Sequence, residues 1–189
     1  MNALSPVVRL GLLAVAWVVW ILPAIVPAMR NREKPIRVDP RARWGLFLES
    51  AGYFVALTHG PNTWAADLEL WRAAAGGVVA LGAIFLFRSA VRNLGRQWRF
   101  DAGLNRDHDL VQTGAYRLVR HPIYASMFGM LLASIFWVGT LPGWPISIAL
   151  FIVGTEIRVR VEDALLRERF GDRFVQWQRS APAYLPWLR

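Results

Sequence analysis

The sequence predicts an all-α, polytopic membrane protein. We expect about five transmembrane helices, a helical hairpin near the carboxyl terminus and an amphipathic carboxyl-terminal helix at the membrane interface. Hydrophobic residues make up 55% of the 189 residues, which is more apolar surface than a soluble domain of this size can bury. The apolar residues are gathered into blocks, and most basic residues lie between those blocks.

The first apolar block covers residues 10–29, twenty residues without a charge. It is long enough to cross a hydrocarbon core of about 30 Å. It is too long for the apolar region of a secretory signal peptide, so we expect a retained transmembrane helix.

Four further apolar blocks follow, and several fall short of the roughly twenty residues of a full span. They should therefore be little tilted, or buried against their neighbours. Only Pro142 and Gly143 separate the last two, which predicts a tight turn and an antiparallel helical hairpin. The blocks cover residues 44–59, 70–87, 124–141 and 144–157.

The formal charge of +9 has a topological explanation. Twenty of the 22 basic residues lie in three segments, 30–43, 88–120 and 158–189. With five spans, all three segments fall on one side of the membrane. The positive-inside rule then puts the amino terminus outside and the carboxyl terminus in the cytoplasm. The basic side chains can also contact anionic lipid headgroups. We therefore expect membrane lipids as partners and no nucleic acid.

The last segment has the pattern of an amphipathic helix broken at Gly171. Its apolar residues recur at three-to-five-residue steps with charged residues between them, which favours a helix lying on the cytoplasmic interface. It is either a membrane anchor or a lid over a site open to cytoplasm and lipid. The apolar residues are Val161, Leu165, Leu166, Phe170, Phe174 and Trp177.

Polar residues concentrate in two motifs, within residues 94–124 and 158–174. The first motif has two parts, L-G-R-x-W and H-x-L-V-x-x-G-x-Y-R-x-V-R-H-P-x-Y, and the second reads R-x-R-x-E-D-x-L-L-x-x-x-F-G. This combination, over residues 94–186, resembles the isoprenylcysteine carboxyl methyltransferase family of integral membrane enzymes. R-H-P-x-Y alone is less specific, because phospholipid N-methyltransferases and membrane sterol reductases carry similar strings.

The resemblance divides the chain and assigns roles by position. Residues 1–93 would hold the first three transmembrane helices, and residues 94–189 the cofactor-binding catalytic region. The family binds S-adenosylmethionine in a cytoplasmic cavity formed by the two motifs. Arg158 matches the family's substrate-side arginine, so it is the expected catalytic and substrate-binding residue. The positions that match the family's cofactor contacts are His108, Asp109, Leu110, Val111, Tyr116, His121, Pro122, Ile123, Tyr124 and Glu162.

These residue types suit the cofactor chemically. Aromatic faces such as Tyr116 and Tyr124 attract a sulfonium cation, and Glu162 can pair with an ammonium group or accept ribose hydroxyls. A carboxylate acceptor is already ionised at neutral pH and needs no general base. An amine acceptor would need one, and His121 is the nearest candidate. The role of Asp163, where many relatives have a second Glu, stays open.

Structural roles are the alternatives for the same residues. Arg158 and Glu162 are four apart on one helix and could form only an exposed ion pair. Tyr116 and Tyr124 could be aromatic anchors at headgroup level.

Three residues outside these roles carry expectations of their own. Glu49 is an acid within a span, and such residues are paired or functional. We expect a structural partner for it, Arg88 or Arg92. Arg96 and Trp98 are expected to fix their loop at the membrane surface.

The sequence therefore favours an S-adenosylmethionine-dependent membrane methyltransferase acting on a lipophilic carboxylate, amine or thiol, and a monomer. The alternatives are an NADPH-dependent reductase of the sterol-reductase type, a phospholipid N-methyltransferase, or a non-enzymatic lipid-binding protein. The absence of Cys and the scattered histidines exclude the usual metal sites, so no metal is expected. No G-x-G-x-x-G follows a strand, which excludes a soluble Rossmann methyltransferase.

Overall fold

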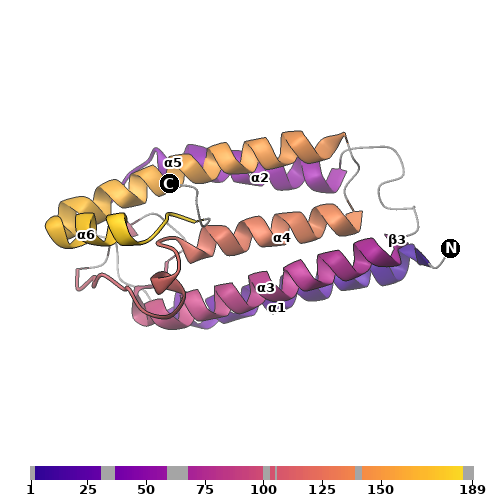
Figure 1. Cartoon of the computed structure of the whole chain (residues 1–189), viewed down its shortest axis with the longest axis horizontal. Coiled ribbons are helices and arrows are strands. Elements are labelled where there is room, and N and C mark those ends of the chain that lie inside the picture. Colours follow the sequence, from indigo (N-terminus) through magenta and orange to yellow (C-terminus); the bar gives the residue numbers. More distant parts are fainter. Residues whose placement is uncertain are drawn as a thin grey trace.

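The computed structural model describes residues 3–30, 37–58, 68–99, 103–104, 106–138 and 142–184. Within these ranges, five long helices run along the long axis of the molecule, and a short sixth helix lies at one end (Figure 1). The all-α fold class predicted from the sequence is confirmed. The helices are α1 (Pro6–Arg30), α2 (Ala42–Thr58), α3 (Leu70–Leu94), α4 (Pro122–Val138), α5 (Gly143–Phe170) and α6 (Asp172–Ser180).

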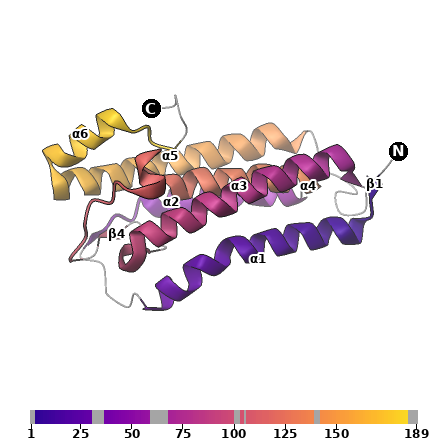
Figure 2. The ribbon, with the colours of Figure 1, turned by 60° about the horizontal axis from the view of Figure 1, so that its bottom comes forward.

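Short extended and 3-10 segments connect the helices. The strand β1 (Ala3–Leu4) pairs antiparallel with β3 (Leu68–Glu69), and β2 (Arg37–Val38) pairs antiparallel with β4 (Gly103–Leu104). In Figure 2, β1 and β4 lie at opposite ends of the bundle, so each pair fixes connections at one end. The 3-10 segments are η1 (Gly95–Gln97) and η2 (Gly114–Arg117).

The helices pack chiefly in two pairs, α2 with α5 and α3 with α4, with α1 against α3 (Figures 1 and 2). Small residues allow the second pair to approach closely. A Cβ on Gly129 of α4 would lie 2.9 Å from the Ala83 Cβ of α3. Helix α5 follows α4 directly in the chain, as the expected hairpin requires. Each of the two helices nevertheless packs mainly against another partner, α4 against α3 and α5 against α2.

Two tryptophans fix α1 to α4 through buried polar contacts. Trp17 Nε1 donates to Ser134 Oγ at 3.2 Å, and Trp20 Nε1 donates to Ser126 Oγ at 2.9 Å. The Trp20 ring stacks on Phe87 of α3, with centroids 4.3 Å apart. The amino-terminal helix is thereby held beside the later helices.

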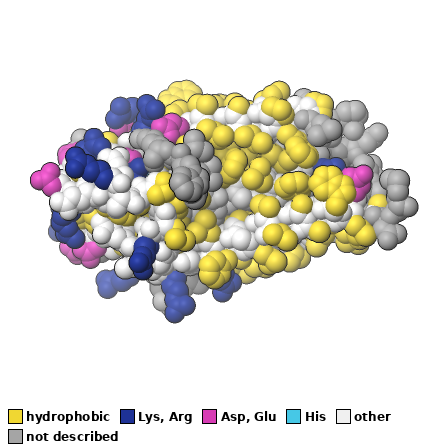
Figure 3. Space-filling model, viewed as in Figure 1, with side chains coloured by type: hydrophobic (Ala, Val, Ile, Leu, Met, Phe, Trp, Pro, Cys, Tyr) yellow, Lys and Arg dark blue, Asp and Glu magenta, His cyan; other side chains and the backbone are white. Residues whose placement is uncertain are grey.

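The surface of the bundle is apolar along its length and charged at one end. On the face in Figure 3, charged side chains gather at the α6 end, and hydrophobic side chains cover much of the rest. Val78, Leu81 and Phe85 of α3 are about 70% exposed or more. Among the described residues, the helical stretches Pro6–Ile25 and Leu70–Gln97 are long and apolar enough to cross a membrane. Together these features fit a lipid environment.

The carboxyl-terminal region differs from the expected arrangement in two respects, the length of α5 and the packing of α6. The fifth helix does not end near residue 157; α5 continues as one helix to Phe170. The break at Gly171 is present, with φ of 53°. Phe174 and Trp177 of α6 are buried in a cluster with Tyr116 rather than exposed. The apolar face of α6 thus packs onto the bundle.

Candidate active site

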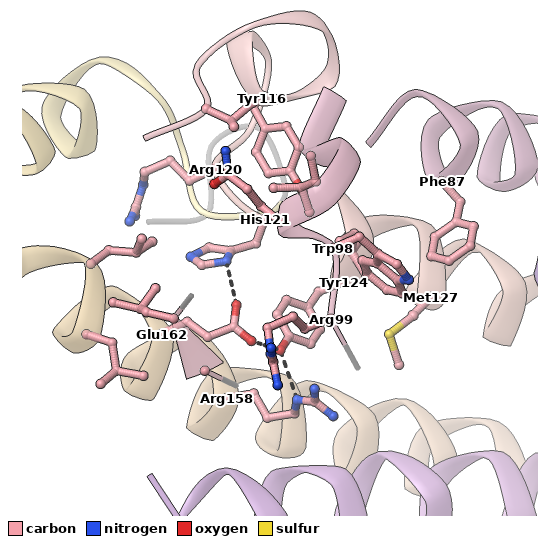
Figure 4. Close-up of a pocket in the computed structure, with 18 of the residues that line it drawn as sticks. Phe87, Trp98, Arg99, Tyr116, Arg120, His121, Tyr124, Met127, Arg158 and Glu162 are labelled. Carbon is pink, nitrogen blue, oxygen red and sulfur yellow. Dashed lines mark hydrogen bonds and ion pairs between the residues drawn. The ribbon is translucent and has the colours of Figure 1, made fainter. Parts of the chain in front are cut away.

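A cavity of about 460 Å³ opens among the helices and the loops at the charged end. Its walls come from α1, α2, α3, α4, α5, residues 97–99, 103–104 and 108–111, and Trp177 of α6. In Figure 4, a polar group around His121 and Glu162 faces an apolar group that includes Phe87 and Met127. The cavity therefore joins two chemically different ends.

Ten of the eleven site residues expected from the sequence line this cavity. The exception is Pro122, which is fully buried at the start of α4 and is not part of the cavity wall. Its missing N–H and fixed φ suit the first position of a helix. The ten that line the cavity are His108, Asp109, Leu110, Val111, Tyr116, His121, Ile123, Tyr124, Arg158 and Glu162.

His121 lies between two carboxylates of α5. Its Nε2 is 2.8 Å from Asp163 Oδ1, and its Nδ1 is 3.3 Å from Glu162 Oε2. Burial lowers the pKa of His121, but the hydrogen bonds with Asp163 and Glu162 outweigh burial and raise that pKa above its ordinary value. With both ring nitrogens facing acceptors, the imidazolium form can donate two hydrogen bonds.

The neighbouring residues complete a charge-balanced cluster. Arg120 Nη1 donates to Asp163 Oδ2 at 2.7 Å, with both side chains buried. The backbone N–H groups of Arg120 and His121 donate to the carbonyls of Pro182 and Ala183, at 2.8 and 2.7 Å. Asp163, whose role the sequence left open, therefore holds Arg120 and His121 in position.

The Tyr124 hydroxyl connects Arg158 to Glu162. It accepts a hydrogen bond from Arg158 Nε at 2.9 Å and donates one to Glu162 Oε1, as the dashed lines in Figure 4 show. The Arg158 guanidinium also lies over the Tyr124 ring, 5.2 Å from its centroid. Tyr124 and Arg158 are buried, so this is an internal network and not the exposed ion pair or headgroup anchor considered from the sequence.

The partner of Glu49 is not the one that the sequence favoured. We expected Arg88 or Arg92, but Glu49 lies against α5, where Arg158 Nη1 is 3.3 Å from its Oε2. Thr155 Oγ1 donates to Glu49 Oε1 at 3.0 Å. The expectation failed because α2 packs on α5, a pairing that the sequence pattern does not specify.

A second polar group in the cavity wall offers an unused contact. His108 Nδ1 is buried and has no hydrogen-bond partner among the residues that the structure describes. Burial lowers the pKa of His108, so its ring is neutral at neutral pH. A buried polar atom without a partner is costly, and a bound polar ligand would satisfy it. This atom, the carboxylate of Glu162 and the faces of Tyr116 and Tyr124 fit a ligand that carries polar groups and a cation.

Sequence reasoning missed the amino-terminal part of the cavity wall. Trp17 and Trp20 of α1 and Tyr53 of α2 line the cavity. They were missed because no motif covers these helices. The three-residue spacing of the two tryptophans on one helix face was the available signal. Trp98 also lines the cavity: it is 4% exposed and donates to the Ala24 carbonyl at 3.2 Å, which ties its segment to α1.

Comparison with known families now decides the relationship of the chain. The family model described as "Phospholipid methyltransferase" matches residues 71–173, more than half of the sequence. The chain belongs to the phospholipid methyltransferase family. The matched region includes both polar motifs and the carboxylates that hold His121.

Two relatives confirm the resemblance to isoprenylcysteine carboxyl methyltransferases. A protein-S-isoprenylcysteine O-methyltransferase of Schizosaccharomyces pombe is 29% identical over 121 residues, 62% of this chain and 50% of the relative. The solved structure of a eukaryotic intramembrane Ras methyltransferase, an isoprenylcysteine carboxyl methyltransferase, matches with a TM-score of 0.58 at 20% identity. The match covers 81% of this chain and 55% of that one. The chain thus spans about half the length of these relatives and shares the fold of the solved structure.

Proposed function

We propose that this phospholipid methyltransferase family member is an S-adenosylmethionine-dependent membrane methyltransferase. Its acceptor would be a lipophilic carboxylate, with a prenylated cysteine terminus as one member of that class. The observation that supports the proposal is that one cavity has a polar end and an apolar end. Glu162, Tyr116 and Tyr124 furnish a polar and aromatic end, and Phe87 belongs to an apolar end. His108 lines the same cavity and interacts electrostatically with Glu162, and the Trp20 ring stacks on Phe87. Its volume is typical of small-molecule sites.

The residues of the polar end are suited to S-adenosylmethionine. Glu162 can accept hydrogen bonds from an ammonium or a ribose, and His108 can hydrogen-bond through its buried Nδ1. Tyr116 and Tyr124 offer π faces to a cation. When bound, this cofactor supplies a methyl group on a sulfonium sulfur, which passes to the acceptor by in-line displacement. The contribution of the chain is then positioning and a preorganised, desolvated site.

The surroundings of His121 favour a carboxylate acceptor. An amine or thiol must lose a proton before or during methyl transfer, whereas a carboxylate needs no base. His121 was the nearest candidate base, but its contacts with Asp163 and Glu162 stabilise its protonated form. It is therefore better suited to orienting Glu162 than to accepting a proton.

Arg158 is positioned to meet the acceptor. In Figure 4, Tyr124 lies between Glu162 and Met127, and Arg158 lies next to Tyr124. A guanidinium presents a planar fork that suits a carboxylate, and the apolar end would hold the lipophilic part of the same molecule. We further propose a monomer with this end of the bundle at the cytoplasmic face.

Ligand titration tests the proposal against its alternatives. Purified protein should bind S-adenosylhomocysteine. A protein that binds NADPH but does not bind S-adenosylhomocysteine would instead support a reductase. Retained membrane insertion without affinity for either ligand would support a non-enzymatic lipid-binding protein. Labelled S-adenosylmethionine with a panel of prenylcysteine analogues, fatty acids and aminolipids then identifies the acceptor. Labelling of aminolipids alone would make the protein a phospholipid N-methyltransferase.

A further inference from the structure

The backbones of α2 and α5 come into direct contact beside the cavity. A Cβ on Gly45 would lie 2.6 Å from the Gly154 carbonyl oxygen, and a Cβ on Gly154 would lie 2.6 Å from the Gly45 carbonyl oxygen. Neither position has room for a larger side chain. The Arg158 side chain passes Gly45, where its Cγ would lie 2.5 Å from an added Cβ, and the Glu49 side chain passes Gly154, where its Cγ would lie 3.0 Å from one. The absence of side chains at the two glycines therefore lets the two charged side chains meet across the helix contact.

Glu49 lies behind Arg158 as seen from the cavity. Arg158 lines the cavity, whereas Glu49 does not and is 1% exposed. The carboxylate of Glu49 has partners at both oxygens, with Thr155 Oγ1 at 3.0 Å and Arg158 Nη1 at 3.3 Å. A buried carboxylate with this arrangement is held in place, and the cation paired with it is Arg158.

Two different atoms of the Arg158 guanidinium are therefore anchored. Nη1 is held by Glu49 of α2, and Nε is held by the Tyr124 hydroxyl of α4. Contacts at two nitrogens of a planar group fix the direction of its plane. An arginine side chain otherwise has many rotamers, and ordering it during ligand binding costs free energy.

We propose that Glu49 is a positioning residue for methyl transfer: it holds the Arg158 guanidinium at the cavity wall in the orientation that receives the acceptor. This inference rests on the proposed function. Glu49 acts from a helix that carries no motif, and it acts through Arg158 without touching the ligands. Its side chain also compensates the buried positive charge, so Arg158 can remain in the wall when no acceptor is present.

The test compares Glu49→Gln with a control in the same helix interface. Glu49→Gln keeps the size of the side chain and removes its charge. Ser147→Ala is the control, because Ser147 Oγ donates to the Gly52 carbonyl at 2.7 Å across the same pair of helices without touching Arg158. We expect Glu49→Gln to lower kcat/KM about tenfold or more, chiefly through KM for the acceptor. S-adenosylhomocysteine affinity should stay within about twofold, and Ser147→Ala should change neither quantity.

A second measurement does not depend on the acceptor. In protein labelled with ¹⁵N-arginine, the Arg158 Nε–H signal can be assigned from its loss in Arg158→Lys. The Arg158 Nε–H should be protected from exchange in the wild type and in Ser147→Ala. It should lose that protection in Glu49→Gln, because the guanidinium is then no longer held at Nη1 in the plane that directs Nε toward Tyr124. If Glu49→Gln does not fold, Thr155→Val removes the other hydrogen bond to Glu49 and should produce the same changes to a smaller degree.

Two results would overturn the inference. One is Glu49→Gln, or the substitute Thr155→Val, with wild-type kcat/KM and a protected Arg158 signal. The other is an equal loss of cofactor affinity and turnover in the Glu49 and Ser147 variants, which would mean that Glu49 only stabilises the interface. A wild-type protein that methylates no acceptor would contradict the proposed function, and the Arg158 signal would still decide whether Glu49 positions the guanidinium.

Discussion

His121 Nε2 lies 2.8 Å from Asp163 Oδ1, and this contact joins the residue before α4 to the carboxyl-terminal half of α5. Because the other ring nitrogen faces Glu162, the direction of the Glu162 carboxylate depends on the same imidazole. The acid expected to hold the cofactor is thus oriented by a side chain from outside α5, and that side chain is itself oriented by Asp163.

Loss of the Glu162 carboxylate should weaken cofactor binding. Glu162→Gln removes the negative charge and replaces one of the two acceptor oxygens with an NH₂ group. A ligand ammonium or ribose hydroxyl that loses this acceptor is left unpaired at a cost on the order of 1–3 kcal/mol, so S-adenosylhomocysteine affinity should fall about tenfold or more. Calorimetric titration measures it. Glu156→Gln is the control, because Glu156 lies on the same helix and receives Arg160 Nε at 2.7 Å, outside the cavity wall. Equal affinities in both variants would remove Glu162 from the cofactor site.

Arg158→Lys should separate turnover from cofactor binding. Lysine keeps the charge but has no planar fork, so it cannot reach Glu49, Tyr124 and an acceptor carboxylate together. We expect S-adenosylhomocysteine affinity to change less than about twofold and kcat/KM to fall about a hundredfold. Methyl transfer and ligand titration on the same preparation check this. Normal turnover in Arg158→Lys would mean that the guanidinium does not contact the acceptor.

The raised pKa of His121 predicts a loss of stability on the alkaline side. A histidine whose folded pKa exceeds its unfolded value of about 6.5 stabilises the fold fully below that value. This contribution disappears as the pH rises through the folded pKa, when the contacts with Glu162 and Asp163 lose their charge. Thermal midpoints between about pH 6 and 9 should therefore fall with pH in the wild type and fall less in His121→Gln.

His108→Gln provides the matched control for this measurement. Burial lowers the pKa of His108, so its contribution to stability changes below about pH 6.5 and is constant above it. This variant should retain the alkaline decline of the wild type. If His121→Gln retains the full decline as well, another group is responsible for it.

Gly154→Ala should disturb both the fold and the site. Its Cβ would lie 2.6 Å from the Gly45 carbonyl oxygen and 2.8 Å from the Glu49 backbone nitrogen, so α2 and α5 must separate. Overpacking of this kind costs about 1–3 kcal/mol. Gly77→Ala is the control, because nothing lies within 4 Å of its Cβ. The thermal midpoint should fall in the first variant only, and equal midpoints would contradict the close contact.

The charge distribution predicts the orientation in the membrane. A reporter fused after Arg189 should be cytoplasmic, and one inserted at Asn62, which lies outside the described residues, should be external. If the reporters after Arg189 and at Asn62 are both found on the same side of the membrane, the model with five spans is contradicted. A reversed result would contradict the orientation alone.

The apolar blocks predicted the positions of the helices well. The blocks at 44–59 and 124–141 correspond closely to α2 (Ala42–Thr58) and α4 (Pro122–Val138). The block at 144–157 ended thirteen residues before α5 does, because hydropathy marks where apolar surface is needed and not where backbone hydrogen bonding stops. Charged residues after Ile157 continue the same helix.

The site was predictable where the motifs reach, and not beyond. Motif positions from His108 to Glu162 converge on one cavity, because the residues of both motifs lie near the same end of the bundle. The contact of Glu49 with Arg158 joins residues 109 positions apart, and it depends on which helices pack together. Trp17 and Trp20 were missed for the same reason: the spacing of apolar residues shows that a helix has an inner face, but not which partner that face meets.

The continuity of α5 limits how the chain can vary in length. Arg158 and Glu162, which we propose contact the acceptor and the cofactor, are separated by about one helical turn, or roughly 6 Å along the axis. One inserted or deleted residue between them would rotate one relative to the other by about 100° and break their shared contact with Tyr124. Functional homologues should therefore differ here by substitution and keep the four-residue interval unchanged.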